Sequence, residues 1–155
     1  MRPEFVERQR NEILRDCSAA GSFSLILIAS LALFLVDRRL AWAMVVSVIA
    51  VELVGGAIKL VAYRVRPDRQ RYAGFLEKVD SGSFPSIHTA RAATALTLIY
   101  LYGRRPEALL IGAPILVLVG VSRILLKRHY LVDVLAGGLF GLAAGWVIWR
   151  ALLAQ

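Results

Sequence analysis

Residues 131–153 read LVDVLAGGLFGLAAGWVIWRALL, an apolar stretch interrupted only by Asp133 near its start and Arg150 near its end. An α-helix rises about 1.5 Å per residue, so a helix of this length covers the roughly 30 Å hydrocarbon core of a bilayer. Trp146 and Trp149 lie near the far end, where an aromatic belt is expected at the membrane surface. The stretch therefore predicts a transmembrane helix and argues against a water-soluble domain.

Four further apolar stretches precede this one in the chain. The 155 residues are 58% hydrophobic and 19% charged, whereas soluble domains have about 45 to 50% apolar residues. No repeat, low-complexity tract or second domain interrupts the pattern. We therefore expect an all-α, polytopic membrane helical bundle in one domain, residues 1–155, with five transmembrane helices at about 17–36, 40–58, 86–102, 108–126 and 131–153.

The first sixteen residues differ from the rest because they carry four arginines and four acidic residues. They contain no apolar run long enough for the core of a cleaved signal peptide. Phe5, Val6, Ile13 and Leu14 fall on one face of a helix, which favours a short interfacial helix over residues 1–16. Solvated disorder is the alternative for this segment.

The net charge of +8 results from nineteen Lys and Arg residues against eleven Asp and Glu residues. In so apolar a chain this excess favours membrane lipids and an anionic substrate as partners, and no nucleic acid is expected. Cys17 is the single cysteine, which excludes an intrachain disulfide framework and a cysteine-rich metal site. The sequence does not indicate the oligomeric state.

Five spans place the N-terminus, the loop before residue 86 and the turn before residue 131 on one face of the membrane. Ionisable residues in or beside transmembrane segments are costly, and they mark functional sites. We therefore expect one site to form from the polar residues that gather at this face, which are Lys59, Arg66, Ser86, His88, Ser122, Arg123, His129 and Asp133.

Two of these pairs suit the binding of a phosphate-like anion. Lys59 and Arg66 are seven residues apart, so both cations can point along one side of the end of a helix. Ser86 and His88 stand at the predicted start of the next helix, where unpaired backbone N–H groups and the helix dipole favour an anion. Ser86 can add a hydroxyl donor or cap the helix.

His129 and Asp133 have the i, i+4 spacing, so the carboxylate can accept a hydrogen bond from one ring nitrogen and make the other a better nucleophile or base. Metal binding is the competing interpretation, because His88 and Asp80 could add further nitrogen and oxygen ligands. The neighbouring cations would repel a divalent ion, so we expect a phosphate site without metal. The absence of a nucleotide-binding glycine loop argues against ATP.

Other charges on this face have simpler interpretations. Arg91 and Glu52 lie deeper in the apolar stretches, and Arg91 either pairs with Glu52 inside the bundle or approaches the site. The sequence leaves that choice open. Six basic residues are interpreted as reaching the lipid headgroups, namely Arg64, Arg69, Arg71, Lys78, Lys127 and Arg128.

Three motifs on this face are similar to those of a known family. KLVAYRVRP, residues 59–67, fits K-x6-R-P; PSIH, residues 85–88, is similar to P-S-G-H; and SRILLKRHYLVD, residues 122–133, fits S-R-x5-H-x3-D. In this order and at these spacings they resemble the type 2 phosphatidic acid phosphatases, also called lipid phosphate phosphatases, which share their site with vanadium haloperoxidases. The chain is identified from these motifs as a member of that family.

The resemblance implies a metal-independent phosphatase that needs no cofactor and acts on a lipid phosphomonoester or diphosphate through a phosphohistidine. It implies that His129 is the nucleophile, that His88 serves as acid and base, and that Asp133 orients His129. The remaining motif residues are then expected to bind the substrate phosphate, and these are Lys59, Arg66, Ser86 and Arg123.

Two features depart from the family pattern. Ile87 replaces the usual glycine of the second motif, and its side chain is expected to crowd the phosphate and alter which headgroup fits. The family core is usually described with six transmembrane helices, so the N-terminal helix is expected to stand in for the missing first one. Which lipid phosphate is the substrate is left open by the sequence.

Two other functional classes are alternatives to a lipid phosphatase. A haloperoxidase using bound vanadate fits poorly, because embedding in a membrane suits a lipid headgroup and not a diffusible halide. A transporter or a scaffold without enzymatic activity is the broader alternative. A transport pathway would place charges in both halves of the membrane, whereas here they gather at one edge.

The charge distribution also bears on orientation in the inner cell membrane. Fourteen of the nineteen basic residues fall on the face that carries the site, and five on the other. Because positively charged residues concentrate on the cytoplasmic side, this count predicts a multi-pass protein with a cytoplasmic site. The resemblance favours the opposite side, since many bacterial members of the family act on the outer face, but we give the charge count more weight.

Overall fold

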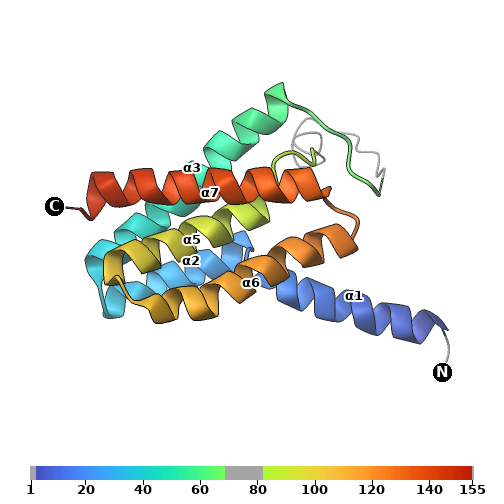
Figure 1. The fold of residues 1–155 in the computed structure, drawn as a ribbon, viewed down its shortest axis with the longest axis horizontal. Helices are drawn as coiled ribbons and strands as arrows, with labels where there is room; N and C mark the ends of the chain where they lie inside the picture. The colour runs from blue at the N-terminus through green and yellow to red at the C-terminus, as the bar shows by residue number, and fades with distance from the viewer. Residues whose placement is uncertain (1–2, 69–81, 155) are drawn as a thin grey trace.

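The computed structural model describes residues 3–68 and 82–154, and this part of the chain is all-α, as predicted. Its helices form an elongated bundle in which α3 and α1 are inclined to α7 (Figure 1). They are α1 (Pro3–Ala19), α2 (Phe23–Ala32), the short 3-10 helix η1 (Leu33–Leu35), α3 (Arg38–Val61), α5 (Ile87–Gly103), α6 (Pro106–Leu125) and α7 (Leu131–Leu152).

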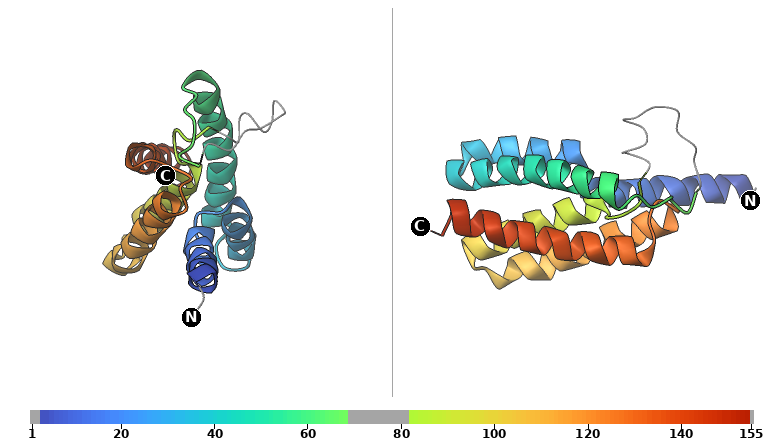
Figure 2. Two further views of the ribbon diagram at one scale, coloured as in Figure 1. Left: turned by 90° about the vertical axis from the view of Figure 1, so that its right-hand side faces the viewer. Right: turned by 90° about the horizontal axis from the view of Figure 1, so that it is seen from above.

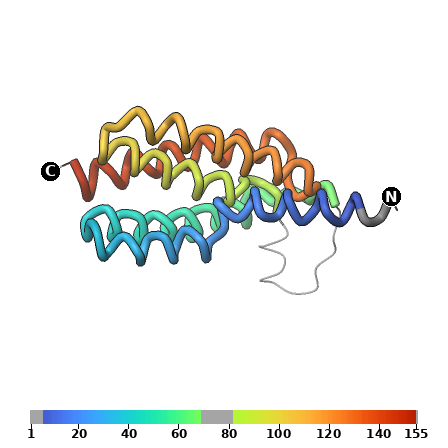
Figure 3. Tube along the Cα trace, turned by 90° about the horizontal axis from the view of Figure 1, so that it is seen from below, coloured from blue at the N-terminus to red at the C-terminus, as the bar shows by residue number. Residues whose placement is uncertain are grey.

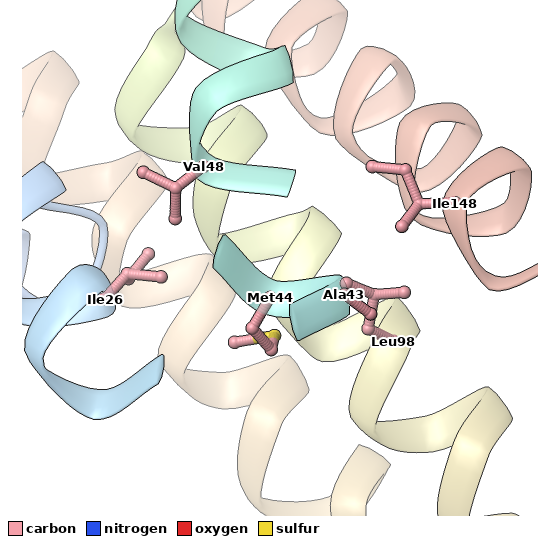
Figure 4. Packing of buried hydrophobic residues seen from close by; sticks show 6 residues of the cluster. All are labelled: Ile26, Ala43, Met44, Val48, Leu98 and Ile148. Carbon is pink, nitrogen blue, oxygen red and sulfur yellow. The ribbon is translucent and has the colours of Figure 1, made fainter. Parts of the chain in front are cut away.

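Helix α5 is the centre of the bundle, because it contacts α2, α3, α6 and α7. Most of its residues are small or apolar, and most of its first half is buried. A second region of the core joins the N-terminal half of the chain to the C-terminal half. It contains Ile26, Ala43, Met44, Val48, Leu98 and Ile148 (Figure 4).

A row of glycines lets α7 approach α5 closely. Gly137, Gly141 and Gly145 are spaced one helical turn apart and are all buried. A Cβ atom added at Gly137 would collide with the carbonyl oxygen of Ser86, and one at Gly141 with that of Ala90. Small residues at such spacing are typical of helix pairs in membranes, where close backbone packing replaces the hydrophobic effect.

Three helices of the described chain are each long and apolar enough to cross a membrane, namely α3, α6 and α7. α5 forms where the third span was predicted, but its 17 residues rise only about 26 Å. α1 and α2 qualify as a span only when taken together, which brings the candidate spans to four. The predicted count of five is thus one more than these criteria give.

The predicted boundary between the interfacial helix, 1–16, and the first span, 17–36, is wrong. α1 continues to Ala19, and a new helix begins after Ser22, whose hydroxyl accepts a hydrogen bond from the backbone N–H of Leu25 at 3.3 Å. The axes of Val6–Ala19 and Phe23–Leu35 differ by 42°. The break contains Gly21, which packs against the carbonyl group of His88 so closely that no Cβ atom would fit.

The prediction that the N-terminal helix lies in the membrane interface stays a prediction. In the structure α1 projects beyond the end of the bundle (Figures 2 and 3). It packs on α6. The apolar side chains of Val6 and Ile13 are exposed on the outside, because the polar side of the helix faces a cavity within the bundle.

The ends of the chain lie at opposite ends of the bundle (Figure 1). The C-terminal end of α3, the beginning of α5 and the turn from α6 to α7 are at the end nearer the N-terminus. The three predicted motifs therefore come together, because α5 and α6 lead the chain away from this end and back to it.

The contact between α7 and α5 can be tested with two identical substitutions one turn apart. We expect Gly141→Ala to lower the free energy of unfolding by about 1 to 3 kcal/mol, because the new methyl group overlaps backbone that cannot move alone. Gly138→Ala, whose Cβ would come no closer than 4.0 Å to any neighbour, is the control and should be neutral or slightly stabilising. Denaturation of both variants in detergent measures the difference, and equal stabilities would contradict close packing at Gly141.

Candidate active site

A cavity of about 530 Å³ opens at the end of the bundle where the three motifs meet. α1, α3, α5 and α6 and the turn after α6 contribute its walls. Five of the seven predicted site residues line it, and these are Lys59, Arg66, His88, Arg123 and His129. Ser86 and Asp133 are fully buried in the walls.

His129 lies in the turn between α6 and α7 and is only 3% exposed. Its Nδ1 is 2.6 Å from the backbone carbonyl oxygen of Ser83. Because a carbonyl can only accept, Nδ1 carries the proton and donates it, which leaves the lone pair of Nε2 free. Burial, reinforced by Arg123, lowers the pKa of His129 to about 3, so the ring is neutral at neutral pH.

The partner predicted for His129 was Asp133, and in this respect the structure differs. α7 begins only at Leu131, so His129 precedes the helix and the i, i+4 geometry does not apply. One oxygen of Asp133 accepts the backbone N–H of Tyr130 at 2.8 Å, which caps α7. The other oxygen is paired with Arg64 at 3.1 Å.

Arg64 is therefore more than a surface residue that reaches the headgroups. It bonds a carboxylate that is 0% exposed, and its guanidinium lies 4.3 Å from the centre of the Tyr130 ring. Arg128, given the same interpretation from the sequence, pairs with Asp68 at 3.3 Å. Both arginines pair with residues about sixty or more positions away in the chain, so the spacing of residues in the sequence could not predict these ion pairs. Arg69, Arg71 and Lys78 lie outside the described residues.

His88 is held by Arg91, which lies one turn further along α5. The Nη2 atom of Arg91 is 3.4 Å from Nδ1 of His88, and because a guanidinium can only donate, Nδ1 accepts and Nε2 carries the ring proton. Arg91 also forms an ion pair with Glu52 of α3 and donates from Nε to the carbonyl oxygen of Gly21 at 2.9 Å. Both alternatives for Arg91 are thus realised, since it pairs with Glu52 and reaches the site.

Three cations surround the two histidines. Lys59 and Arg66 are 5% and 7% exposed, and Arg123 is half-buried near the end of α6, where its Nη1 atom donates to the Ser18 hydroxyl at 3.1 Å. Lys59 is on the last turn of α3, which ends at Val61, so Arg66 reaches the cavity from the segment after the helix. The two are therefore not on one helical face, as the spacing suggested.

Ser86 and Ile87 form the beginning of α5. Ser86 occupies the N-cap position, but its hydroxyl shares a hydrogen bond with Thr89 at 2.9 Å and does not line the cavity. Its backbone N–H donates to the carbonyl oxygen of Asp133 at 2.9 Å, which joins the second and third motifs. Ile87 does line the cavity, as expected from its replacement of glycine, and its side chain packs near Gly55 of α3.

Several residues of the site were missed in the sequence. The carbonyl group of Ser83 carries no side-chain signal, and the polar residues Arg10, Asn11 and Arg15 of α1 line the cavity although their helix was predicted to lie elsewhere. Within residues 3–68 and 82–154, no three His, Cys, Asp or Glu residues are grouped as a metal site. Asp80, considered as a ligand from the sequence, lies outside the described residues.

Comparison with known proteins finds relatives among both curated proteins and solved structures. The chain is 33% identical over 115 residues to the lipid A 1-phosphatase of Porphyromonas gingivalis, an alignment that covers 70% of this chain and 24% of that protein. This chain thus spans about a quarter of the length of the curated relative. It also resembles the crystal structure of a transmembrane PAP2-type phosphatidylglycerolphosphate phosphatase from Bacillus subtilis, with a TM-score of 0.69 and 25% identity over 97% of this chain and 78% of that one.

A model of the PAP2 superfamily matches residues 40–155, which include all three motifs and every helix from α3 onward. The family identified from the motifs is thereby confirmed, and the solved relative agrees with a bundle that crosses the membrane several times. The chain belongs to the PAP2 superfamily and is a multi-pass membrane protein.

Proposed function

We propose that this protein is a lipid phosphate phosphatase that hydrolyses a phosphomonoester or diphosphate through a phosphohistidine, without metal. The observation that carries the proposal is the opposite protonation of two histidines in one cationic cavity. His129 presents a lone pair at Nε2 because Ser83 accepts from Nδ1, whereas His88 presents an N–H because Arg91 donates to its Nδ1. One ring is prepared to attack and the other to donate.

In the first step, Nε2 of His129 attacks the phosphorus atom, and the bond to the leaving oxygen breaks. Lys59, Arg66 and Arg123 line the cavity around the transferring group and stabilise its equatorial oxygens electrostatically. Ser86 contributes by positioning the start of α5, since its N–H donates to the carbonyl oxygen of Asp133 and its own carbonyl group lies against Gly137 of α7. Asp133 contributes indirectly, because it pairs with Arg64 and accepts a hydrogen bond from the backbone of the turn that carries His129.

His88 completes both steps by moving a proton. A proton that enters with the phosphate substrate protonates Nδ1 of His88, which then no longer accepts from Arg91, and the Nε2–H of the ring goes to the leaving oxygen. In the second step Nε2 of His88 accepts a proton from water as the water oxygen attacks phosphorus and the bond to His129 breaks. Inorganic phosphate and the proton that entered with the substrate leave, and both histidines return to their resting states.

A lipid substrate is supported by the position of the cavity and by the relatives. The cavity opens where the apolar surfaces of α3, α6 and α7 end, so a phosphate could enter it while its acyl or prenyl chains remain in the bilayer. Both relatives are named for phosphatases acting on lipid phosphates. Many of the charged side chains among the described residues gather around this cavity at one end of the bundle, which supports an enzyme over a transport pathway.

We place the active site on the cytoplasmic face. This rests on the excess of basic residues at that end of the bundle. A phosphate group made in the cytoplasm on a membrane lipid would then reach the cavity without crossing the membrane.

The nucleophile can be tested by substitution. We expect His129→Ala to lower turnover of a lipid phosphomonoester by more than about 10³-fold, because no phosphohistidine can form. Rapid quenching of the wild type should trap an acid-labile phosphoprotein that the variant lacks. Arg150→Gln, an exposed change at the opposite end, is the control and should keep full activity. Substantial turnover by a folded His129→Ala variant would contradict the mechanism.

The role of the cations predicts the response to chelators and to vanadate. Excess chelator should leave the activity unchanged, since charge stabilisation comes from Lys59, Arg66 and Arg123. Vanadate should inhibit, because it adopts a trigonal bipyramidal geometry like that of the transition state. Steady-state rates with each addition measure both effects. Loss of activity in chelator, with recovery on adding a divalent ion, would favour metal catalysis instead.

The proposed orientation can be tested with fusions at the C-terminus, which lies at the opposite end of the bundle from the turn between α6 and α7 (Figure 1), whose residues line the cavity. Alkaline phosphatase fused after Gln155 should be active, because that enzyme matures only outside the cytoplasm. A fluorescent protein that matures only inside should remain dark. The reverse pattern would place the cavity on the outer face. It would contradict the proposed orientation but not the proposed phosphatase reaction.

A further inference from the structure

The polar side of α1 forms a wall of the catalytic cavity, although α1 lies outside the region that matches the family. Glu7, Asn11, Arg15 and Ser18 follow one another at intervals of three or four residues, so they occupy one face of the helix. The first three line the cavity. Ser18 is buried and bonded to Arg123.

Two hydrogen bonds fix this helix to the catalytic residues. Arg123 of α6 donates to the Ser18 hydroxyl at 3.1 Å, and Arg91 of α5 donates to the carbonyl oxygen of Gly21 at 2.9 Å. Gly21 itself lies against the backbone of His88. The position of α1 is therefore set by the same side chains that hold the phosphate and orient His88.

Arg15 extends the positive charge of the cavity beyond the proposed phosphate site. It lies one turn, about 5 Å along the helix axis, from Ser18 and hence from the contact with Arg123. Within residues 3–68 and 82–154, no carboxylate is paired with Arg15. Arg10, by contrast, pairs with Glu7 at 3.2 Å.

Basic side chains outnumber acidic ones in the described lining of the cavity, eight to two. Three of the basic residues are paired with carboxylates, Arg91 with Glu52, Arg10 with Glu7 and Arg128 with Asp68. Arg15 therefore adds positive charge to the α1 wall, where it can attract an anionic group next to the transferred phosphate.

We propose that Arg15, assisted by the amide of Asn11, forms a second anion subsite that binds a phosphate group adjoining the one removed. This rests on the proposed function and narrows it to substrates with two phosphates near the headgroup. The second phosphate belongs either to a diphosphate or to a phosphodiester one alcohol unit away. Both present the same oxygens to a guanidinium, which binds them through paired hydrogen bonds.

The test compares three substrates on the same diacylglycerol anchor: a monophosphate, a diphosphate, and a glycerol-spaced compound with an inner phosphodiester and a terminal phosphomonoester. We expect Arg15→Gln to raise KM about tenfold for whichever two-phosphate substrate fits the subsite, and to change kcat/KM for the monophosphate less than about twofold. Arg15→Lys should recover part of the loss, since it keeps the charge but not the paired geometry.

Arg8→Gln is the matched control, because Arg8 is on the same helix but pairs with Glu12 at the surface and does not line the cavity. It should behave as the wild type with all three substrates. The subsite is refuted if Arg15→Gln affects the monophosphate as strongly as the two-phosphate compounds, or if Arg8→Gln has the same effect. Comparison of the two larger substrates tells a diphosphate from a phosphodiester.

A binding measurement separates this inference from the proposed activity. Calorimetry should show that the wild type binds inorganic diphosphate more tightly than orthophosphate, and that Arg15→Gln removes the difference. If the wild type hydrolyses none of the lipids but keeps this preference, the proposed function fails and the subsite stands. If hydrolysis occurs and the preference is absent, or is unchanged in Arg15→Gln, the subsite fails alone.

Discussion

The close packing of α7 on α5 is the constraint on which the site depends. Gly137 has no room for a side chain beside the carbonyl group of Ser86, and the N–H of Ser86 donates to the carbonyl oxygen of Asp133. Because this contact sets the distance between two helix starts, it brings the turn that carries His129 next to His88. In a membrane, where apolar surfaces gain little by meeting, such backbone contact is what fixes helix positions.

Electrostatics then determine what the two histidines can do. Nδ1 of His129 is hydrogen-bonded to the Ser83 carbonyl, which can only accept, and Nδ1 of His88 is hydrogen-bonded to the Arg91 guanidinium, which can only donate. Burial and the nearby Arg123 lower the pKa of His129, which keeps its ring neutral and able to attack. The proposed roles of His129 as nucleophile and His88 as acid therefore arise from their different hydrogen-bond partners, since the two side chains are identical.

The N-terminal helix illustrates how one polar face can be interpreted in two ways. An amphipathic segment with Val6 and Ile13 on one side fits a helix lying on a membrane, but it fits equally a helix whose polar side faces a cationic cavity. Gly21 and the bonds made by Arg91 and Arg123 favour the second arrangement. None of these contacts leaves a local pattern, because each joins residues more than sixty positions apart.

The helical class, the spans α3, α6 and α7, and the cavity-lining residues of the three motifs could be predicted from the amino-acid sequence. Apolar length and spacing within one helix or turn are local properties, so they can be recognised without knowledge of the fold. Three features became evident only from the folded chain: Asp133 is paired with Arg64, Ser83 orients His129, and α1 forms a wall of the site. These depend on where a helix starts and on which backbone lies opposite, and both are set by packing between segments distant in the chain.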